Sequence, residues 1–206
     1  MLQTLKGLPA FLYQQRIKGF DPPGDEPFMD PEGSERFKQE LAKANNYVEF
    51  GSGGTTVQAD RFRVPTLSVE SDRFYARAVA SRLQSQCVEQ IVVDLGFTGE
   101  WGAPLISNRN KGRRYVSAPF RGGSFPDLIL VDGRYRAACA LESARRAHQA
   151  GATANLLFDD YGTRPHYRVV ERVLGRPEMA GRVAVFNVGK RPVSQEAVQT
   201  LLGDKR

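Results

Sequence analysis

The sequence predicts an α/β fold with a mostly parallel β-sheet and helices on both of its faces. Three observations carry this prediction. Strand-like and helix-like segments alternate from Tyr47 onward, as they do in folds built from β-α-β units. Several strand-like segments are short and almost wholly apolar, which is typical of parallel strands buried on both faces. A glycine-rich turn and several acidic residues follow individual strands, where open α/β sheets bind ligands.

Six short apolar segments are the predicted strands. The first runs into the glycine-rich turn, and the third, around Ile91, Val92 and Val93, is apolar enough for burial on both faces. In chain order, the strands are expected at residues 47–50, 66–69, 90–94, 127–133, 154–160 and 181–188.

The predicted helices lie between these strands and before the first one. Asp72 is a suitable N-cap for the helix that follows the second strand, and Gly151 is placed to end the alanine-rich helix. Helices are expected at residues 32–44, directly after the glycine turn, and at 72–84, 137–150, 165–174 and 195–202. Residues 2–12 form a short amphipathic piece, and residues 21–31 are rich in proline, glycine and acid, as in a linker. We therefore expect residues 1–45 to be an N-terminal helical extension that packs on a main domain of residues 46–206.

Composition predicts a cytoplasmic protein that forms one compact domain. The chain has 206 residues, of which 41% are hydrophobic and 25% charged, as in ordinary globular proteins. Its start lacks the pattern of a signal peptide. No apolar run approaches the roughly 20 residues that span a bilayer, so no membrane partner is expected. Cys87 and Cys139 lack metal-ligand spacing and fit reduced thiols.

Positive charge is concentrated in the long connection at residues 97–126. The chain carries a net charge of +6, and this connection holds five basic residues against Glu100 alone. A basic loop can steer an anionic partner, including RNA, toward it. No RNA-binding motif accompanies the charge, and a solvated loop without a ligand explains it equally well.

The glycine-rich turn and the second strand together indicate a nucleoside site. Residues 51–54 read Gly-Ser-Gly-Gly, and glycines let the backbone approach a ligand where a β-carbon would clash. Glu70 ends the second strand, about where nucleotide-binding α/β folds place an acceptor for ribose hydroxyls. Acids also end three later strands, at Asp94, at Asp132 and at the pair Asp159–Asp160.

These residues resemble a class I S-adenosylmethionine (SAM)-dependent methyltransferase. The resemblance covers roughly residues 47–188 and rests on Glu49 before the Gly51-x-Gly53 turn, on Glu70 and on the order of acidic strand ends. The chain is also similar to a small, poorly characterised methyltransferase-like group with Val-Asp-Gly-Arg-x-Arg after strand four, here residues 131–136. The resemblance implies a Rossmann-like sheet of seven strands, mostly parallel, with a C-terminal antiparallel strand. Residues 176–188, turning at Gly181, are compatible with the hairpin that this fold requires.

The resemblance also implies a role for each candidate residue in binding SAM. The glycine turn would lie against the methionyl part, with Glu49 near the amino acid group. Glu70 would accept from both ribose hydroxyls, Asp94 would meet adenine, and Asp132 would border the reacting methyl group. The implied cofactor-binding residues are Glu49, Gly51, Ser52, Gly53, Gly54, Glu70 and Asp94.

The candidate catalytic residues are Asp132, Asp159 and His166. Asp132, Asp159 and Asp160 would suit a magnesium ion that activates a substrate hydroxyl, as in catechol-type O-methyltransferases. In the alternative interpretation, these acids cap helices or face water. His166 could act as a general base just beyond the fifth strand, or it could simply start a helix.

Three functional hypotheses follow from the sequence. The first is a SAM-dependent methyltransferase whose acceptor is undetermined and could be anionic. The second is a catalytically inactive protein of the same fold that binds SAM or a nucleotide for regulation or partner contact. The third is a nucleotide-dependent enzyme of another type, because Gly-x-Gly also opens dinucleotide-binding folds. Thr56 stands where such folds usually have glycine or alanine. The sequence does not determine the oligomeric state.

Overall fold

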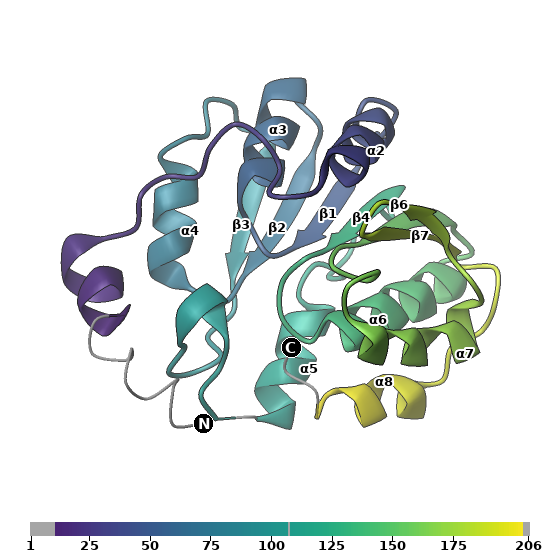
Figure 1. Ribbon diagram of the computed structural model, residues 1–206. Helices are drawn as coiled ribbons and strands as arrows, with labels where there is room; N and C mark the ends of the chain where they lie inside the picture. Colours follow the sequence, from purple (N-terminus) through teal and green to yellow (C-terminus); the bar gives the residue numbers. More distant parts are fainter. Residues whose placement is uncertain (1–10, 107, 204–206) are drawn as a thin grey trace.

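A computed structural model describes residues 11–106 and 108–203, which form one seven-stranded sheet. The strand order is β3-β2-β1-β4-β5-β7-β6, so the predicted Rossmann-like α/β fold is confirmed (Figure 1). The strands are β1 (Tyr47–Phe50), β2 (Thr66–Glu70), β3 (Val88–Val92), β4 (Leu128–Val131), β5 (Ala154–Phe158), β6 (Glu178–Ala180) and β7 (Val183–Val188).

The first five strands run parallel, and the last two close the sheet as a hairpin. β7 pairs antiparallel with both β5 and β6. The turn between β6 and β7 contains Gly181 at φ +57°, a left-handed conformation that favours glycine. The expected seven strands and the C-terminal antiparallel strand are therefore both present.

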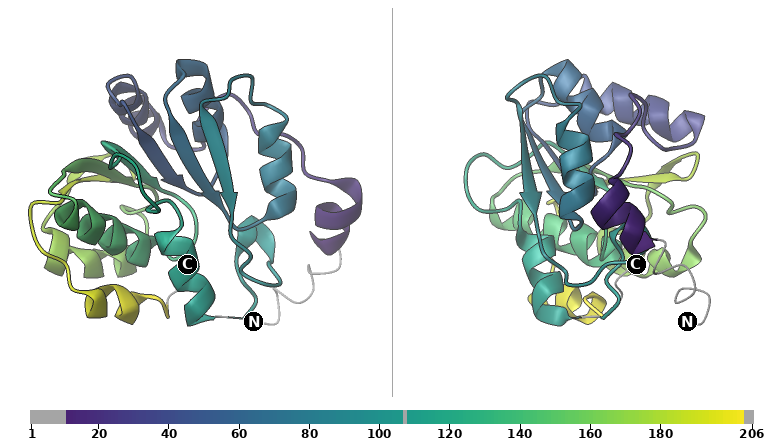
Figure 2. Two further views of the ribbon diagram at one scale, coloured as in Figure 1. Left: turned by 180° about the vertical axis from the view of Figure 1, so that it is seen from behind. Right: turned by 90° about the vertical axis from the view of Figure 1, so that its left-hand side faces the viewer.

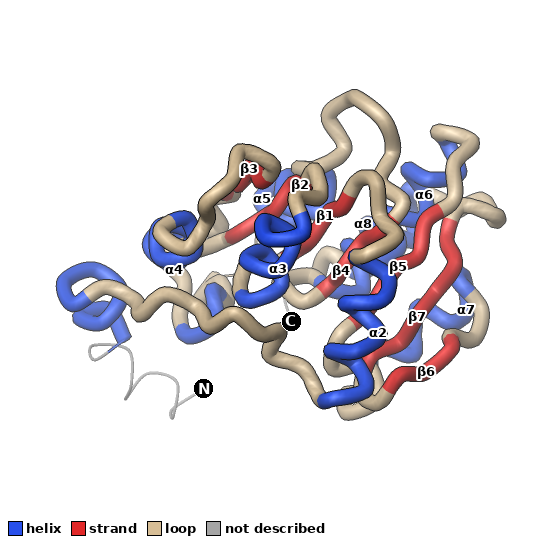
Figure 3. Tube along the Cα trace, turned by 90° about the horizontal axis from the view of Figure 1, so that it is seen from above, coloured by secondary structure: helices blue, strands red, loops and turns tan. Residues whose placement is uncertain are grey.

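Helices cover the two faces of the sheet. Figure 3 shows α2, α3 and α4 on one face and α5 and α6 on the other, and α8 packs against α6. None of the helices in the described part of the chain is long and apolar enough to cross a membrane. The helices are η1 (Gln14–Lys18), α2 (Pro31–Leu41), α3 (Gly54–Phe62), α4 (Arg73–Ala80), η2 (Glu100–Gly102), α5 (Arg109–Ser117), α6 (Arg136–Gln149), η3 (Pro165–Val170), α7 (Glu171–Leu174) and α8 (Gln195–Leu201).

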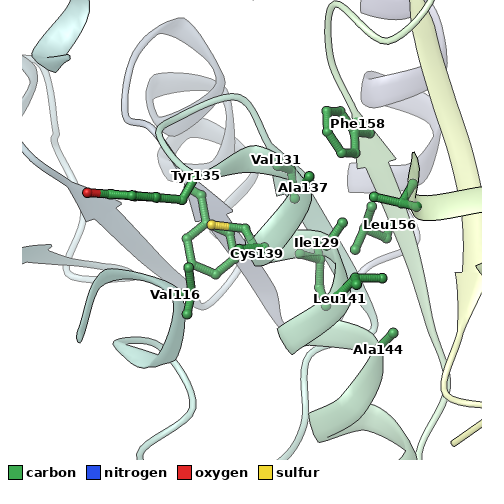
Figure 4. Packing of buried hydrophobic residues seen from close by; sticks show 14 of the residues in the cluster. Val116, Ile129, Val131, Tyr135, Ala137, Cys139, Leu141, Ala144, Leu156 and Phe158 are labelled. Carbon is green, nitrogen blue, oxygen red and sulfur yellow. The ribbon is translucent and has the colours of Figure 1, made fainter. Parts of the chain in front are cut away.

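The apolar run of β4 contributes to both cores because successive side chains of a strand point to opposite faces. Ile129 and Val131 join the cluster that α5, α6 and α8 cover, and Figure 4 shows them packed beside α6. Leu128 and Leu130 join the cluster on the α2 and α3 side. A continuous apolar strand is therefore what a doubly covered sheet needs at its centre.

The third strand differs from its prediction in place and in burial. β3 covers Val88–Val92 instead of 90–94, and it is an edge strand whose Val92 is 46% exposed. The expectation that this strand is buried on both faces is wrong. Helix α5 packs against α6, so it leaves one face of β3 uncovered. None of the described helices lies over β2 and β3 from behind (Figure 2, left). A groove lined by Leu67, Ile91 and Ala118 remains there.

Other boundaries differ only locally. The helix after Asp72 ends at Ala80, and the helix predicted at 165–174 begins as the 3-10 helix η3. The basic connection contains α5, which the sequence analysis did not predict. Most of the amphipathic piece at 2–12 lies outside the described residues. Cys87 and Cys139 are free, as expected.

The N-terminal segment runs along the face of the sheet that α2, α3 and α4 cover. Helix η1 packs on α4, where Gln15 donates hydrogen bonds to Asp72 and Thr98. Residues 19–30, which we call the strap, then run past α4 and α3 to α2 (Figures 1 and 2). Helix α2 places Phe37 and Leu41, both fully buried, in the core. The division at residue 45 stays a prediction.

Candidate functional site

Two glycines meet where β1 and β4 end side by side. A β-carbon on Gly51 would stand 2.8 Å from Cα of Gly133, and Gly51 has φ +93°. A β-carbon on Gly133 would stand 2.1 Å from the hydroxyl oxygen of Tyr115. The chain leaves β1 toward β2 on one side, and β4 lies on the other, so this is the switch point at which open α/β sheets bind ligands. We call this region, residues 51–54 and 132–133, the switch crevice.

Glu70 joins the end of β2 to the glycine turn. Its Oε2 accepts from the amide of Ser52 at 3.1 Å and from the Ser52 hydroxyl at 2.9 Å. Its Oε1 accepts from the amides of Ser71 and Asp72 at 2.6 and 2.9 Å, and from the Ser71 hydroxyl at 3.2 Å. The amides hold the carboxylate in place, whereas the two serine hydroxyls occupy acceptor positions that other hydroxyls could take.

Glu49 lies inside the protein instead of on the crevice surface. The residue is fully buried, and burial raises the pKa of its carboxyl group. The hydroxyls of Tyr47, Thr55 and Thr56 donate to this carboxylate, and Thr56 also accepts from the amide of Gly53 at 2.8 Å. Glu49 therefore anchors the start of α3, and its predicted contact with a ligand remains untested.

Tyr75 is a crevice residue that sequence reasoning missed. Its hydroxyl lies 3.7 Å from where a β-carbon of Gly53 would be. Burial raises the pKa of Tyr75 to about 12, and the charges of Glu70, Glu49 and Asp132 act in the same direction. The sequence feature that could have predicted this position is Asp72. As the N-cap of α4, Asp72 places Tyr75 in the first turn of that helix, next to the end of β2.

The predicted adenine end of the site is more open. The side chain of Asp94 is 82% exposed and pairs with Lys111 of α5 at 3.1 Å. The Gly96 amide and Lys111 hold the pKa of Asp94 below its usual value. Trp101 is 79% exposed and stacks on Phe28 of the strap, with ring centroids 6.3 Å apart.

The three candidate metal-binding carboxylates do come together, but arginines pair with them. Oxygens of Asp132, Asp159 and Asp160 lie within 4.8 Å of one another. Arg136, which is 4% exposed, pairs with Asp132 at 2.8 Å and with Asp160 at 3.1 Å. Arg182 binds both oxygens of Asp159 at 2.9 Å, and Arg164 pairs with Asp160 at 2.7 Å.

A magnesium ion would have to displace guanidinium groups from these carboxylates. Three arginines already balance the three negative charges, and Asp159 is held bidentately. The donor set therefore fits a carboxylate–arginine network better than a magnesium site, and the magnesium hypothesis stays untested.

Asp132 differs from its two neighbours in its electrostatic environment. Burial raises the pKa of Asp132 to about 7, and Asp159 and Asp160 add to the rise, although Arg136 opposes it. Its side chain is 32% exposed, against 2% for Asp159. Asp132 is therefore the member of the trio that stays accessible from the switch crevice.

His166 is exposed on η3, and its ring packs against Tyr167 with centroids 4.3 Å apart. Its predicted role as a general base remains a prediction.

Comparison with known proteins decides the family. No family model and no curated protein matches the sequence. The solved structure of a methyltransferase-like protein from Silicibacter pomeroyi is 35% identical to this chain, with a TM-score of 0.74, and the match covers 88% of this chain and 96% of that one. The chain belongs to the class I methyltransferase-like family.

A more distant solved structure is also similar to this chain. An O-methyltransferase from Bacillus cereus, solved in complex with SAH, is 12% identical over 90% of this chain and 99% of that one, with a TM-score of 0.47. At these values the likeness says nothing about function. The function proposed for this chain therefore depends on the residues of its own switch crevice.

Proposed function

We propose that this methyltransferase-like protein is a SAM-dependent methyltransferase that binds SAM in the switch crevice. The observation that carries the proposal is the position of Glu70. Its carboxylate is held at the end of β2 beside Ser52 of the glycine turn. Hydroxyls of Ser52 and Ser71 now donate to positions that the two ribose hydroxyls of SAM would use.

The surrounding residues fit the other parts of SAM. Gly51 and Gly133 let the backbone at the ends of β1 and β4 pack closely, which places the glycine turn beside Asp132. Ionised Asp132 would stabilise a positive charge at this point. Trp101 and Asp94 lie on the β2–β3 side, where the resemblance expects adenine.

The chain's own residues would mainly align the reactants. When bound, SAM supplies a methyl group on a positively charged sulfur. Glu70 and the glycine turn would fix its orientation, and fixing orientation can account for much of the rate of a displacement reaction. Asp132, with a pKa near 7, can accept the proton that the acceptor loses. Arg136 would position Asp132 through its ion pair, and Asp159 would position Arg136 through its backbone carbonyl, which accepts from the guanidinium at 2.9 Å.

Binding can be tested through the single tryptophan of the chain, Trp101. SAM and SAH are titrated into the protein while Trp101 fluorescence is followed, with calorimetry as an independent readout. Glu70→Gln should weaken binding at least about tenfold, since a hydrogen bond to a charged group contributes about 1.5–3 kcal/mol. Glu89→Gln, an exposed carboxylate on β3, is the matched control and should bind normally. Thermal melting of both variants checks that Glu70→Gln remains folded.

Activity is tested by transfer of a radiolabelled methyl group to a metabolite and RNA panel. Saturable binding with transfer supports the proposal. Binding without any transfer would favour a non-enzymatic SAM-binding protein instead. If the intact protein binds neither SAM nor SAH, both SAM hypotheses fail, and NAD and nucleotide sugars are tested in the same assay.

A further inference from the structure

Arginines surround the carboxylates at the ends of β4 and β5, and one of them differs from the rest. Arg136, Arg164 and Arg182 each pair with an aspartate. Arg134 makes no side-chain hydrogen bond or ion pair with any residue that the structure describes. It is the first arginine of the Val-Asp-Gly-Arg-x-Arg segment, whose purpose the proposed function leaves open.

The Arg134 side chain is partly buried, and no described carboxylate forms a direct ion pair with it. Its Nε is inaccessible to solvent and has no partner. Burial lowers the pKa of Arg134, and the positive charge of Arg136 acts in the same direction. An N–H group that is shielded from water and has no acceptor is costly in free energy. Such a group is explained when its partner is a ligand.

The position of Arg134 indicates which ligand that is. It directly follows Gly133 at the switch crevice, and its amide donates to the Tyr115 hydroxyl at 3.3 Å. Asp132 is close enough for its negative charge to raise the pKa of Arg134, against the effect of burial. It therefore lies at the β4 side of the crevice, whereas the residues proposed to hold SAM's ribose lie at the end of β2. The acceptor would occupy the β4 side.

The neighbouring helix adds positive charge to the same side. Helix α5 packs against Tyr135, the residue that follows Arg134. A β-carbon on Gly112 of α5 would stand 3.0 Å from the Tyr135 ring. Arg109, Arg113 and Arg114 of α5 are exposed. Charges of one sign beside a crevice raise the local concentration of ligands of opposite charge.

We propose that Arg134 binds an oxyanion, a carboxylate or a phosphate, of the methyl acceptor. That the bound oxyanion belongs to a methyl acceptor rests on the proposed function, but the oxyanion site itself can be tested without SAM. A guanidinium offers two parallel N–H groups to either oxyanion, so the shared chemistry is bidentate recognition.

The test follows the melting temperature of the 206-residue chain in a chloride buffer of constant ionic strength. Inorganic phosphate and acetate are the probes, each at concentrations up to 100 mM. Wild type should melt roughly 3 °C higher when a probe is tenfold above its Kd. A rise with phosphate alone indicates a phosphorylated acceptor, and a rise with acetate indicates a carboxylate.

Variants separate a ligand-binding arginine from a structural one. Arg134→Gln should abolish the probe-dependent rise and should melt no lower than wild type without the probe, because it removes an unpaired, partly buried charge. Arg134→Lys should keep part of the rise. Arg168→Gln, an exposed arginine on η3, should behave as wild type. The inference is overturned if no probe raises the melting temperature of wild type, or if Arg134→Gln keeps the full rise.

SAM titration of the same variants distinguishes this inference from the proposed function. Arg134→Gln should bind SAM with the wild-type Kd. Loss of the oxyanion response with intact SAM binding supports the inference. If no variant binds SAM but the response to phosphate or acetate still depends on Arg134, the oxyanion site stands and the proposed function fails.

Discussion

At the scale of single residues, similar side chains have different environments in this protein. Glu49 is enclosed by hydroxyls, Glu70 is held by amides, and Asp159 is clamped by Arg182. Asp132 combines a raised pKa with partial exposure. A carboxylate of this kind changes charge near neutral pH, so it can make binding depend on pH.

Asp132 should make SAM binding, but not SAH binding, depend on pH. As pH rises through about 7, Asp132 ionises. It should then favour the positively charged sulfur of SAM by about 1–2 kcal/mol, or roughly tenfold. The SAM-to-SAH affinity ratio, measured at pH 6 and pH 8, should rise in wild type and stay flat in Asp132→Asn. Glu89→Gln, an exposed carboxylate on β3, is the control and should show the same rise as wild type. A flat ratio in wild type would remove Asp132 from the cofactor site.

The same shift affects stability. The folded pKa of Asp132 is raised to about 7, whereas an aspartate in the unfolded chain titrates near 3.9. Between these values the folded protein binds the extra proton. The contribution of Asp132 to the free energy of unfolding therefore falls as pH rises through that window.

At the scale of elements, the strap is held to the start of α3. The carbonyl oxygen of Glu26 lies 2.1 Å from where a β-carbon of Gly54 would be. Asp25 pairs with Arg61 of α3 and with Arg82, and its carbonyl accepts from Gln58 at 2.6 Å. The strap therefore depends on a glycine at the first position of α3.

Gly54→Ala should loosen the strap without unfolding α3. Alanine is the better helix residue, so α3 itself should not weaken. The clash with Glu26 should raise the rate of limited proteolysis within the strap by roughly tenfold, since overpacking costs about 1–3 kcal/mol. Gly53→Ala is the matched control, because its β-carbon meets nothing nearer than 3.7 Å. An unchanged cleavage rate in Gly54→Ala would show that the strap does not need this contact.

At the scale of the whole molecule, β1 and β4 join the two halves of the sheet. β2 and β3 lie on one side of this pair, and β5, β7 and β6 on the other. The Gly51–Gly133 contact sits directly at the end of the pair. A substitution that pushes Gly51 and Gly133 apart therefore strains the pairing of β1 with β4, which joins the two halves of the sheet.

Gly133→Ala should destabilise the whole protein. Its β-carbon would stand 2.8 Å from backbone atoms of Gly51 and Phe50, which cannot move independently of the sheet. We expect a loss of about 1–3 kcal/mol in the free energy of unfolding, measured in urea by circular dichroism. Gly24→Ala, where a β-carbon meets nothing within 4 Å, should change it by less than about 0.5 kcal/mol. Full rescue by Tyr115→Phe would contradict the backbone clash as the cause.

The sequence by itself determined the fold class, the start of β1, the glycine turn and Glu70 at the end of β2. These features could be predicted because strand alternation, glycine turns and helix caps are local, involving residues a few positions apart. Helix α5 and the edge position of β3 were missed. A polar, basic segment gives little periodic signal, and burial depends on which helix covers a strand.

Only the tertiary structure decided which distant residues meet. Gly51 touches Gly133, Arg182 donates to Phe28 from 154 positions away, and Arg136 joins the acids of two strands. It also placed Glu49 inside the protein and left the buried Nε of Arg134 without a hydrogen-bond partner. These outcomes depend on strand order and on the packing of side chains between elements, which no local pattern of the sequence encodes.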